Sequence, residues 1–223
     1  MVSMKIDFHT HTHHSFDSMM KPAKILELAK GRGLDGIVIC DHDTIAGGLE
    51  TQALNDDPEF LVIVGAEIKT DAGDVTGLFL TDEIQSRKCA DVCDEIHAQG
   101  GKTILNHPYV AHDLTKVDFS KIDYIEGYNG RTSKEKNQLA VDLAELHDLP
   151  VVGGSDAHLY GEVARTYTIV DDAVDLRPIR IEGQRSAFRY KVLSQYIKAF
   201  KQRRPRVLMG ATVMYIKYLL GKK

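Results

Sequence analysis

Asp-Phe-His-Thr-His-Thr-His-His-Ser-Phe-Asp, the stretch from Asp7 to Asp17, indicates both the fold and the kind of site that the chain carries. Residues 4–8 alternate apolar and polar side chains, which is typical of a short strand, and the histidines follow where that strand ends. Residues two apart on an extended backbone point to the same side, so His9 and His11 can direct imidazole nitrogens at one point. Two neutral imidazoles that converge in this way suit a divalent ion such as zinc, iron or manganese.

The same arrangement recurs along the chain, because short apolar runs end directly before residues that can bind metal. Together with the first strand, these runs predict seven strands, the others at residues 36–40, 60–64, 75–80, 102–105, 122–128 and 151–152. Segments with helical periodicity lie between them, at residues 22–31, 46–54, 82–99 and 133–146, and in the last one Leu139, Leu143 and Leu146 are expected to face inward. The alternation predicts a closed or nearly closed parallel α/β barrel, in which reactive groups collect on the loops after the strands.

Length and composition limit the class of protein. The chain has 223 residues, enough for one large α/β domain or for a domain with an appendage. No charge-free apolar run reaches 18 residues, and the N-terminus lacks the layout of a signal peptide, so a cytoplasmic location is the default expectation. The three cysteines, Cys40, Cys89 and Cys93, are odd in number and lack the paired spacing of a cysteine metal site or a disulfide framework.

Charge is distributed unevenly and predicts a boundary near Asp175. Residues 176–223 contain 13 Lys and Arg and one acid, a balance of +12, whereas residues 1–175 carry a balance of −16. We therefore expect a barrel domain over residues 1–175 and a basic helical extension over residues 176–223. The extension has three interpretations: a helix that covers the barrel, a contact with nucleic acid or another polyanion, or attachment to an acidic membrane surface.

Eight residues at the predicted strand ends are good metal ligands: His9, His11, Asp17, His42, Glu67, His107, Asp156 and His158. They are too many for one four-coordinate ion, which implies two or three divalent ions close together. Such a cluster can bind a phosphate ester, lower the pKa of a bound water to roughly 7, and stabilise the attacking and leaving oxygens. No Gly-x-Ser-x-Gly nucleophile motif and no Walker loop offers a different chemistry.

The motifs resemble those of the polymerase and histidinol phosphatase (PHP) family of metal-dependent phosphoesterases. The resemblance covers about residues 4–175 and rests on five motifs in order: His9-Thr10-His11 with Ser15 and Asp17, Asp41-His42-Asp43, Gly65-Ala66-Glu67, Asn106-His107-Pro108 and Gly153 to His158. It implies a distorted (β/α)7 TIM-like barrel with a three-metal site at the C-terminal strand ends.

The resemblance also implies which residues hold each ion. One ion would take His9, His11, Glu67 and Asp156; a second would share Glu67 and take His107; a third would take Asp17, His42 and His158. Many relatives place a further histidine or cysteine on the second ion, and this chain does not. Glu126, at the end of the sixth strand, is the candidate that completes that site. Within this set, Glu67, Asp156 and His158 are assigned to catalysis.

Substrate contacts are assigned to Asn129, Arg131 and Arg165, which follow or adjoin loops that carry ligands. A guanidinium group can bind phosphate through two hydrogen bonds, which suits the two arginines to this role.

The sequence therefore predicts a metal-dependent phosphoesterase, with two or three Zn, Mn or Fe ions, that hydrolyses a phosphomonoester or a nucleotide-type phosphodiester by metal-activated hydroxide. The expected partner is a small phosphorylated substrate or nucleotide. One alternative is a metal-dependent amidohydrolase, although Glu67 takes the position where that class usually has a modified lysine. The other is a metal-stabilised, non-catalytic module whose basic tail binds nucleic acid or a partner.

Overall fold

A computed structural model describes residues 3–172 and 175–220 of the chain. Within these residues nine strands form one sheet, in the spatial order β7-β6-β5-β4-β3-β2-β1-β8-β9. The strands are β1 (Met4–Thr10), β2 (Gly36–His42), β3 (Leu61–Lys69), β4 (Asp74–Leu78), β5 (Lys102–Leu105), β6 (Tyr124–Asn129), β7 (Val151–Gly154), β8 (Thr166–Val170) and β9 (Pro178–Gly183). The first seven correspond to the seven apolar runs of the sequence, in the same order.

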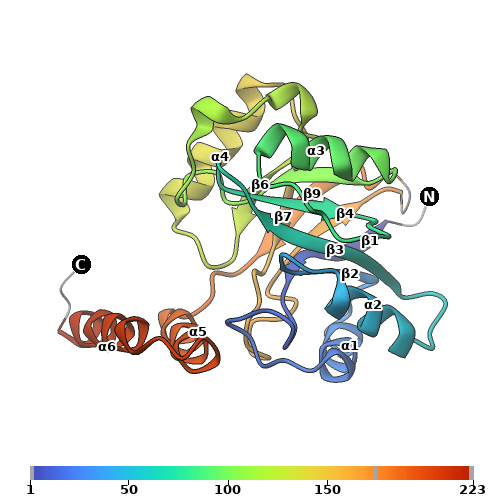
Figure 1. Cartoon of the computed structure of the whole chain (residues 1–223). Coiled ribbons are helices and arrows are strands. Elements are labelled where there is room, and N and C mark those ends of the chain that lie inside the picture. Colours follow the sequence, from blue (N-terminus) through green and yellow to red (C-terminus); the bar gives the residue numbers. More distant parts are fainter. Residues whose placement is uncertain (1–2, 173–174, 221–223) are drawn as a thin grey trace.

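The sheet curls into a nearly closed barrel, which confirms the predicted fold (Figure 1). A single bridge between Thr10 and Ala157 joins the end of β1 to the loop that follows β7. The barrel interior is filled by alternate side chains along the strands, including Ile6 and Phe8 on β1 and Val38 on β2. The carboxyl ends of β1, β2 and β3 consequently lie near the loop after β7, which is the edge where the sequence predicts the site.

The barrel is not wholly parallel, and this differs from the prediction. Strand β4 pairs antiparallel with both β3 and β5, and β8 and β9 are antiparallel additions beside β1. The reason for the β4 direction is the connection that precedes it: residues 70–73 form a tight turn, whereas a parallel crossover needs a dozen residues or more. As a result, β4 begins rather than ends at the edge that carries the site.

Six α-helices and two short 3₁₀ helices occur among the described residues. They are α1 (Pro22–Gly31), α2 (Ala46–Leu54), α3 (Cys89–Ala98), α4 (Lys134–Leu146), α5 (Phe188–Lys201), α6 (Pro205–Leu219), η1 (Leu114–Lys116) and η2 (Phe119–Lys121). Helix α3 starts at Cys89 instead of after Asp82, because residues 82–88 form a loop whose backbone binds the Glu95 carboxylate through Gln85 N and Ser86 N. On α4, Leu143 is buried as expected, whereas Leu139 and Leu146 are exposed.

The predicted extension is not helical throughout. Residues 178–183 form β9, which pairs with β8 as the edge strand of the barrel sheet, while the domain boundary near Asp175 stays a prediction. Beyond β9, helices α5 and α6 form a hairpin that projects beside the barrel (Figure 1). Residues 221–223 of the expected extension lie outside the described part of the chain.

Candidate metal centre

The predicted metal ligands converge on one edge of the barrel. Each of these side chains is delivered by the end of a strand or by the loop directly after it: His9 and His11 by β1, His42 by β2, Glu67 by β3, His107 by the loop after β5, and Asp156 and His158 by the loop after β7. Asp17 comes from the loop between β1 and α1. The structure therefore brings together all eight ligands that the strand-end pattern selects.

Four ligand atoms surround one point in the centre of this group. His9 Nε2 and His11 Nε2 are 3.1 Å apart, and His9 Nε2 lies 3.5 Å from Glu67 Oε2 and 3.7 Å from Asp156 Oδ1. His11 Nε2 is 3.5 Å from each of the same two oxygens. A tetrahedral ion with bonds of about 2.1 Å needs ligand atoms about 3.4 Å apart, so this set has the spacing of a metal site.

The hydrogen bonds of Ser15 fix the direction of the His11 ring. Ser15 Oγ donates its proton to Asp41 Oδ1 at 2.7 Å. Ser15 Oγ must therefore act as the acceptor in its second contact, in which His11 Nδ1 donates to it at 3.1 Å. With the proton on Nδ1, the lone pair of His11 Nε2 points into the ligand group. Asp41 is held in turn by the Thr12 N–H and hydroxyl, at 2.6 Å each. Asp41 and Ser15 thus orient a ligand without being part of the predicted ligand set.

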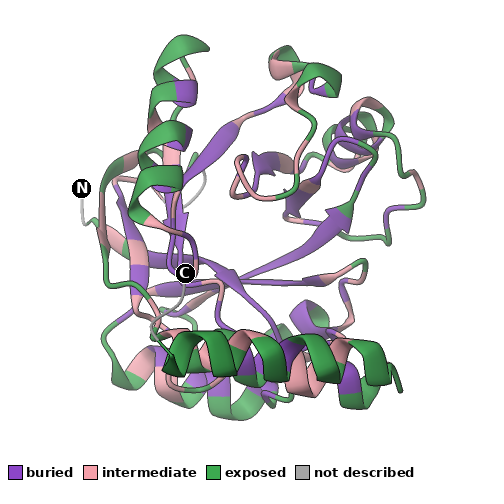
Figure 2. Cartoon of the chain, turned by 90° about the vertical axis from the view of Figure 1, so that its left-hand side faces the viewer, coloured by how far each residue is buried: buried purple, intermediate pink, exposed green. Residues whose placement is uncertain are grey.

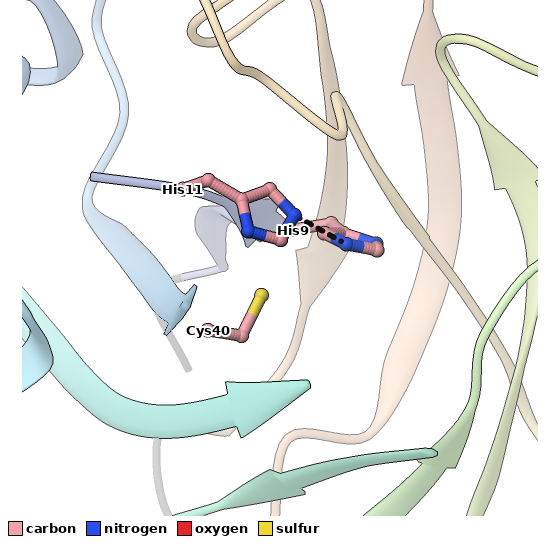
Figure 3. A group of neighbouring side chains, drawn as sticks. All are labelled: His9, His11 and Cys40. Carbon is pink, nitrogen blue, oxygen red and sulfur yellow. Dashed lines mark hydrogen bonds between the residues drawn. The ribbon is translucent and has the colours of Figure 1, made fainter. Parts of the chain in front are cut away.

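Glu126 has the corresponding role behind His9. Its Oε1 accepts from His9 Nδ1 at 2.9 Å, while Oε2 accepts from His107 N at 2.9 Å and from Asn129 Nδ2 at 3.0 Å. The structure therefore places the Glu126 carboxylate behind His9 instead of in the ligand group, in contrast to the sequence interpretation of Glu126 as a ligand. His9 Nε2 and His11 Nε2 are placed to share a proton across 3.1 Å (Figure 3). A bound cation would replace that proton.

Glu67 joins this group to the histidines on either side. Its Oε2 is 3.1 Å from His42 Nδ1 and lies near His9 and His11, whereas its Oε1 is 3.1 Å from His107 Nε2. A carboxylate whose two oxygens face different ligands has the geometry of a bridge between ions. This placement agrees with the shared-ligand role expected for Glu67.

Asp17, His42 and His158 form a further group. Asp17 Oδ2 lies 3.4 Å from His42 Nε2, and Asp17 Oδ1 lies 3.2 Å from His158 Nε2. Among the described residues, Asp17 Oδ1 is buried but has no hydrogen bond of normal geometry. A buried carboxylate oxygen near an imidazole, without a proper hydrogen bond to it, fits two ligands that share an ion.

Asp74 is a candidate ligand that the sequence interpretation missed. Ligand atoms of Glu67, Asp74 and His107 lie within 4.8 Å of one another, so these residues could hold an ion together. Asp74 also pairs with Lys69 across 3.0 Å. The aspartate reaches the site because β4 is antiparallel and starts at this edge. The sequence signal for this placement is the four-residue connection before β4, which is too short for a parallel crossover and therefore predicts an antiparallel strand.

Cys40 lies beside His9 and His11, and its sulfur could in principle join them around an ion (Figure 3). Complete burial raises the pKa of the Cys40 thiol far above its usual range, and Sγ is placed to donate weakly to Thr10 O at 3.8 Å. The neutral thiol is a poorer ligand than the carboxylates and imidazoles around it. We therefore assign the cluster to the histidines and acids.

Backbone strain occurs at two of the ligands. Asp156 has φ 51° and His107 has φ 27°, in the region that side-chain-bearing residues rarely adopt. The loop with Asp156 is held by buried Asp7, whose carboxylate accepts from Ser155 N at 2.8 Å and from Ala164 N at 3.1 Å. Buried hydrogen bonds therefore offset the strained conformation that places this ligand.

The acidic cluster strongly affects the histidines. Burial lowers the pKa of His42 and of His107, but the neighbouring carboxylates, of which Glu67 contributes most, together outweigh burial and raise each pKa to about 9. The pKa of Glu67 is held well below its ordinary value, since His9 and His42 outweigh the opposing effect of burial. Without a metal ion, protons therefore neutralise this cluster, and metal binding must displace them.

Metal-free protein is accordingly expected to lose stability as pH rises from 6.5 to about 9. The folded pKa of His42 and His107 lies above the ordinary value of 6.5, so their stabilisation is complete below pH 6.5 and is lost as pH passes through about 9. Melting temperatures measured in chelator at several pH values check this. Metal-loaded protein serves as the control and should show a smaller fall, because bound ions hold the neutral imidazoles. A melting temperature of the metal-free protein that rises over this range would contradict the assignment.

A pocket of about 420 Å³ opens beside the ligands. His107 and Asp156 lie at one side of it, and its wall includes Lys136 from α4, Arg185 from the segment before α5, and Lys191 from α5. The C-terminal residues thus contribute positive charge next to the metal centre. Sequence analysis did not assign these three residues, because their approach to the site depends on how the hairpin packs.

The predicted substrate residues have other contacts. The Arg131 guanidinium borders the pocket but forms an ion pair with buried Glu162 at 3.2 Å and donates to Ser194 Oγ at 2.6 Å. Asn129 is fully buried, and its amide donates to Glu126 and to Asp156. Arg165 lines a separate pocket of about 530 Å³ that contains none of the predicted metal ligands. The structure therefore places Arg131 and Asn129 beside the metal centre. It places Arg165 in a different pocket.

Helix α5 is fastened to the loop that carries Asp17. Lys201 Nζ, at the C-terminal end of α5, donates to the backbone oxygens of His13 at 2.6 Å, Ser15 at 2.5 Å and Ser18 at 3.0 Å. Three carbonyl acceptors satisfy all three donors of one ammonium group. The end of α5 therefore fixes the backbone around a metal ligand.

Known proteins resemble parts of this chain in sequence and in fold. The model of the PHP-associated family matches residues 134–179. The uncharacterized protein MJ1587 of Methanocaldococcus jannaschii is 38% identical over 117 residues, which cover 48% of this chain and 68% of that protein. The uncharacterized protein MJ0417 of the same organism is 32% identical over 176 residues, which cover 74% of this chain and 69% of that protein.

A solved structure resembles the fold. It is a two-domain protein from Bacteroides vulgatus that contains a predicted PHP-like metal-dependent phosphoesterase. The match has a TM-score of 0.68 and 20% identity, and it covers 82% of this chain and 65% of the other. The family match over residues 134–179 and the fold shared with a PHP-like protein support the assignment of this chain to the PHP family.

Proposed function

We propose that the protein is a metal-dependent hydrolase that cleaves a phosphoester bond in a small phosphorylated molecule. The observation that carries the proposal is the position of the cationic pocket directly beside the ligand cluster. His107 and Asp156 belong to both, while Lys136, Arg185 and Lys191 supply positive charge to the pocket wall. An anionic group held by this wall would lie next to His107, whose Nε2 is 3.1 Å from Glu67 Oε1.

Divalent ions at these ligands would polarise a phosphoryl oxygen and lower the pKa of a water molecule. The residues of the chain supply orientation and charge. Ser15 and Glu126 keep the Nε2 atoms of His11 and His9 directed into the cluster. The cationic wall would bind phosphate oxygens and offset their charge, with lysine and arginine acting as donors.

The dimensions of the pocket favour a small substrate. A volume of about 420 Å³ lies in the range of small-molecule sites, about 300 to 1,000 Å³. The structurally similar protein from Bacteroides vulgatus is described as containing a predicted PHP-like metal-dependent phosphoesterase, which supports the same chemical class for this chain. A phosphomonoester or a nucleotide-type phosphodiester is therefore proposed over a polymeric substrate.

Two rivals make different predictions. A metal-dependent amidohydrolase would cleave an amide or lactam and would not need the cationic wall. A non-catalytic module would bind metal but would turn over no substrate. The bridging Glu67 and the charged pocket favour the phosphoesterase over both.

The test combines elemental analysis with a substrate panel. Purified protein, reloaded with manganese or zinc, is expected to contain two or three ions per chain and to hydrolyse p-nitrophenyl phosphate or its bis-substituted diester. Hydrolysis confined to amide or lactam substrates would favour the amidohydrolase. Bound metal without turnover of any phosphoester would favour the binding module, and protein that takes up no metal would contradict the metal centre itself.

Replacing Arg185 and Lys191 by Gln is expected to raise KM about tenfold or more and to change kcat much less, because the wall binds the anion but lies outside the ligand cluster. Steady-state kinetics with a phosphomonoester measure both constants. Arg189→Gln with Arg206→Gln is the matched control: it also removes two positive charges from the C-terminal helices, and neither residue lines the pocket. Equal effects of the two changes would show that overall charge, rather than the wall, determines KM.

A further inference from the structure

Helix α6 packs against α5 on one side and is exposed to solvent on its other sides. It packs against α5 through stacked rings of Phe188 and Tyr218, whose centroids are 4.5 Å apart, and through a hydrogen bond of 3.1 Å between Tyr196 and Thr212. Within the described part of α6, Ala211 alone is buried. Figure 2, in which the hairpin faces the viewer, shows most of α6 as exposed.

The exposed side of α6 is apolar, which is unusual for a helix in water. Its solvent-facing side chains include Leu208, Met209, Val213, Ile216 and Leu219, with exposed fractions from 47% to 66%. A surface helix normally presents polar and charged residues to solvent, and a helix that is apolar all round is normally covered. The composition of α6 therefore calls for a partner that removes this face from water.

The charge around α6 restricts what that partner can be. The sequence contains no Asp or Glu after Glu182, while the bases Arg203, Arg204 and Arg206 lie where α6 begins and Lys217 lies in its last turn. A partner must therefore offer both an apolar layer and negative charge. Nucleic acid offers charge without an apolar layer, and the hairpin of a second copy carries the same positive charge.

An anionic lipid bilayer has both properties. We propose that α6 lies in the interface of a membrane that contains anionic lipids, with its apolar side among the acyl chains and its bases near the headgroups. It lies on the surface instead of crossing it: its 15 residues extend about 22 Å, whereas the hydrocarbon core is about 30 Å thick. No helix among the described residues has the length and apolarity that a membrane span requires.

Vesicle sedimentation tests the proposal on the full chain. Binding to vesicles of phosphatidylglycerol and phosphatidylcholine should be at least about tenfold stronger than binding to phosphatidylcholine alone, since each basic residue near an anionic surface adds a several-fold factor. Absence of sedimentation with the anionic vesicles would overturn the proposal. So would equal binding to both vesicle types, which would remove the role of the bases.

A double variant locates the surface. Met209→Glu with Ile216→Glu places two charges seven residues apart on the exposed face of α6 and is expected to abolish vesicle binding. Leu139→Glu with Leu146→Glu is the matched control, because it replaces two exposed leucines seven residues apart on α4 by the same charges. Vesicle binding that survives in the α6 variant would contradict the location, and circular dichroism checks that both variants are folded.

A fluorescent reporter tests the same surface without disrupting it. The chain has no tryptophan, so Tyr215→Trp places a single indole on α6. Its emission should shift to shorter wavelength when anionic vesicles are added, whereas Leu146→Trp should show no shift. If light scattering instead shows a dimer that the double α6 variant converts to monomer, and no blue shift occurs with vesicles, the face is an interface between copies and the membrane proposal is wrong.

Discussion

Glu67→Gln is expected to reduce kcat/KM for a phosphoester about a thousandfold or more and to lower the metal content of the purified protein. The two oxygens of Glu67 face different histidines, with Oε1 near His107 and Oε2 near His9, His11 and His42. An amide in this position loses the charge that holds two ions. Metal ions contribute several kcal/mol to stabilisation of the transition state, and about 4 kcal/mol corresponds to a factor of about a thousand.

His107→Ala provides the comparison within the site. Its imidazole contacts one oxygen of Glu67 and belongs to one side of the cluster, so the loss of metal and activity should be smaller than for Glu67→Gln. Glu27→Gln is the charge-matched control, since Glu27 pairs with Lys24 on the surface, away from the ligands. Elemental analysis and steady-state kinetics are measured on all three. Equal and mild losses for the Glu67 and His107 variants would contradict the bridging role.

A chain that ends at Gly183 is expected to lose at least about a hundredfold in kcat/KM, whereas a chain that ends at Arg204 should retain hydrolysis. The first truncation removes α5 and with it Lys201, which donates to three backbone oxygens around Asp17. It also removes Arg185 and Lys191 from the pocket wall. A small displacement of reacting groups can cost about a hundredfold in rate. The second truncation removes α6 and leaves these contacts in place.

A point variant separates the loop contact from the loss of the helix. Lys201→Gln should lower activity and metal content while α5 stays in place, and Lys217→Gln, on α6, removes the same charge without a contact to the loop. Circular dichroism must first show that each truncated chain is folded. If the folded chain ending at Gly183 keeps full hydrolysis, α5 is a passive cover; if the chain ending at Arg204 loses hydrolysis, α6 contributes to the site.

The strand order and most of the site could be predicted from local signals. Buried runs such as residues 36–40 are short, apolar and followed by ligand-type residues, and a barrel collects such residues at one edge. The same logic failed for Asp74, because it assumed that every strand is parallel. The turn at residues 70–73 is too short for a crossover, so its length carried the information that the apolar pattern lacked.

Other features depend on packing that the sequence does not encode locally. Glu126 lies at a strand end like a ligand, but which partner it meets depends on the position of His9 on a strand far away in the chain. The exposure of Leu139 and Leu146 depends on how α4 is rotated about its axis against the barrel. The charge composition predicted that the C-terminal segment is basic but did not predict β9. An edge strand can carry an arginine on its solvent side, so basic residues do not distinguish it from a surface helix.

The contact between Lys201 and the loop around Asp17 can form only after Lys201 has been synthesised. The site therefore reaches its final structure later than its first ligands are made. During synthesis His9 and His11 are made well before Lys201, which lies 190 residues after His11 in the chain. Domains fold as units once their residues are available. The imidazoles of His9 and His11 therefore lack the support of the Lys201 contacts until about 190 further residues have been synthesised. The backbone contacts around Asp17 are completed only when α5 has been made and has packed against the barrel.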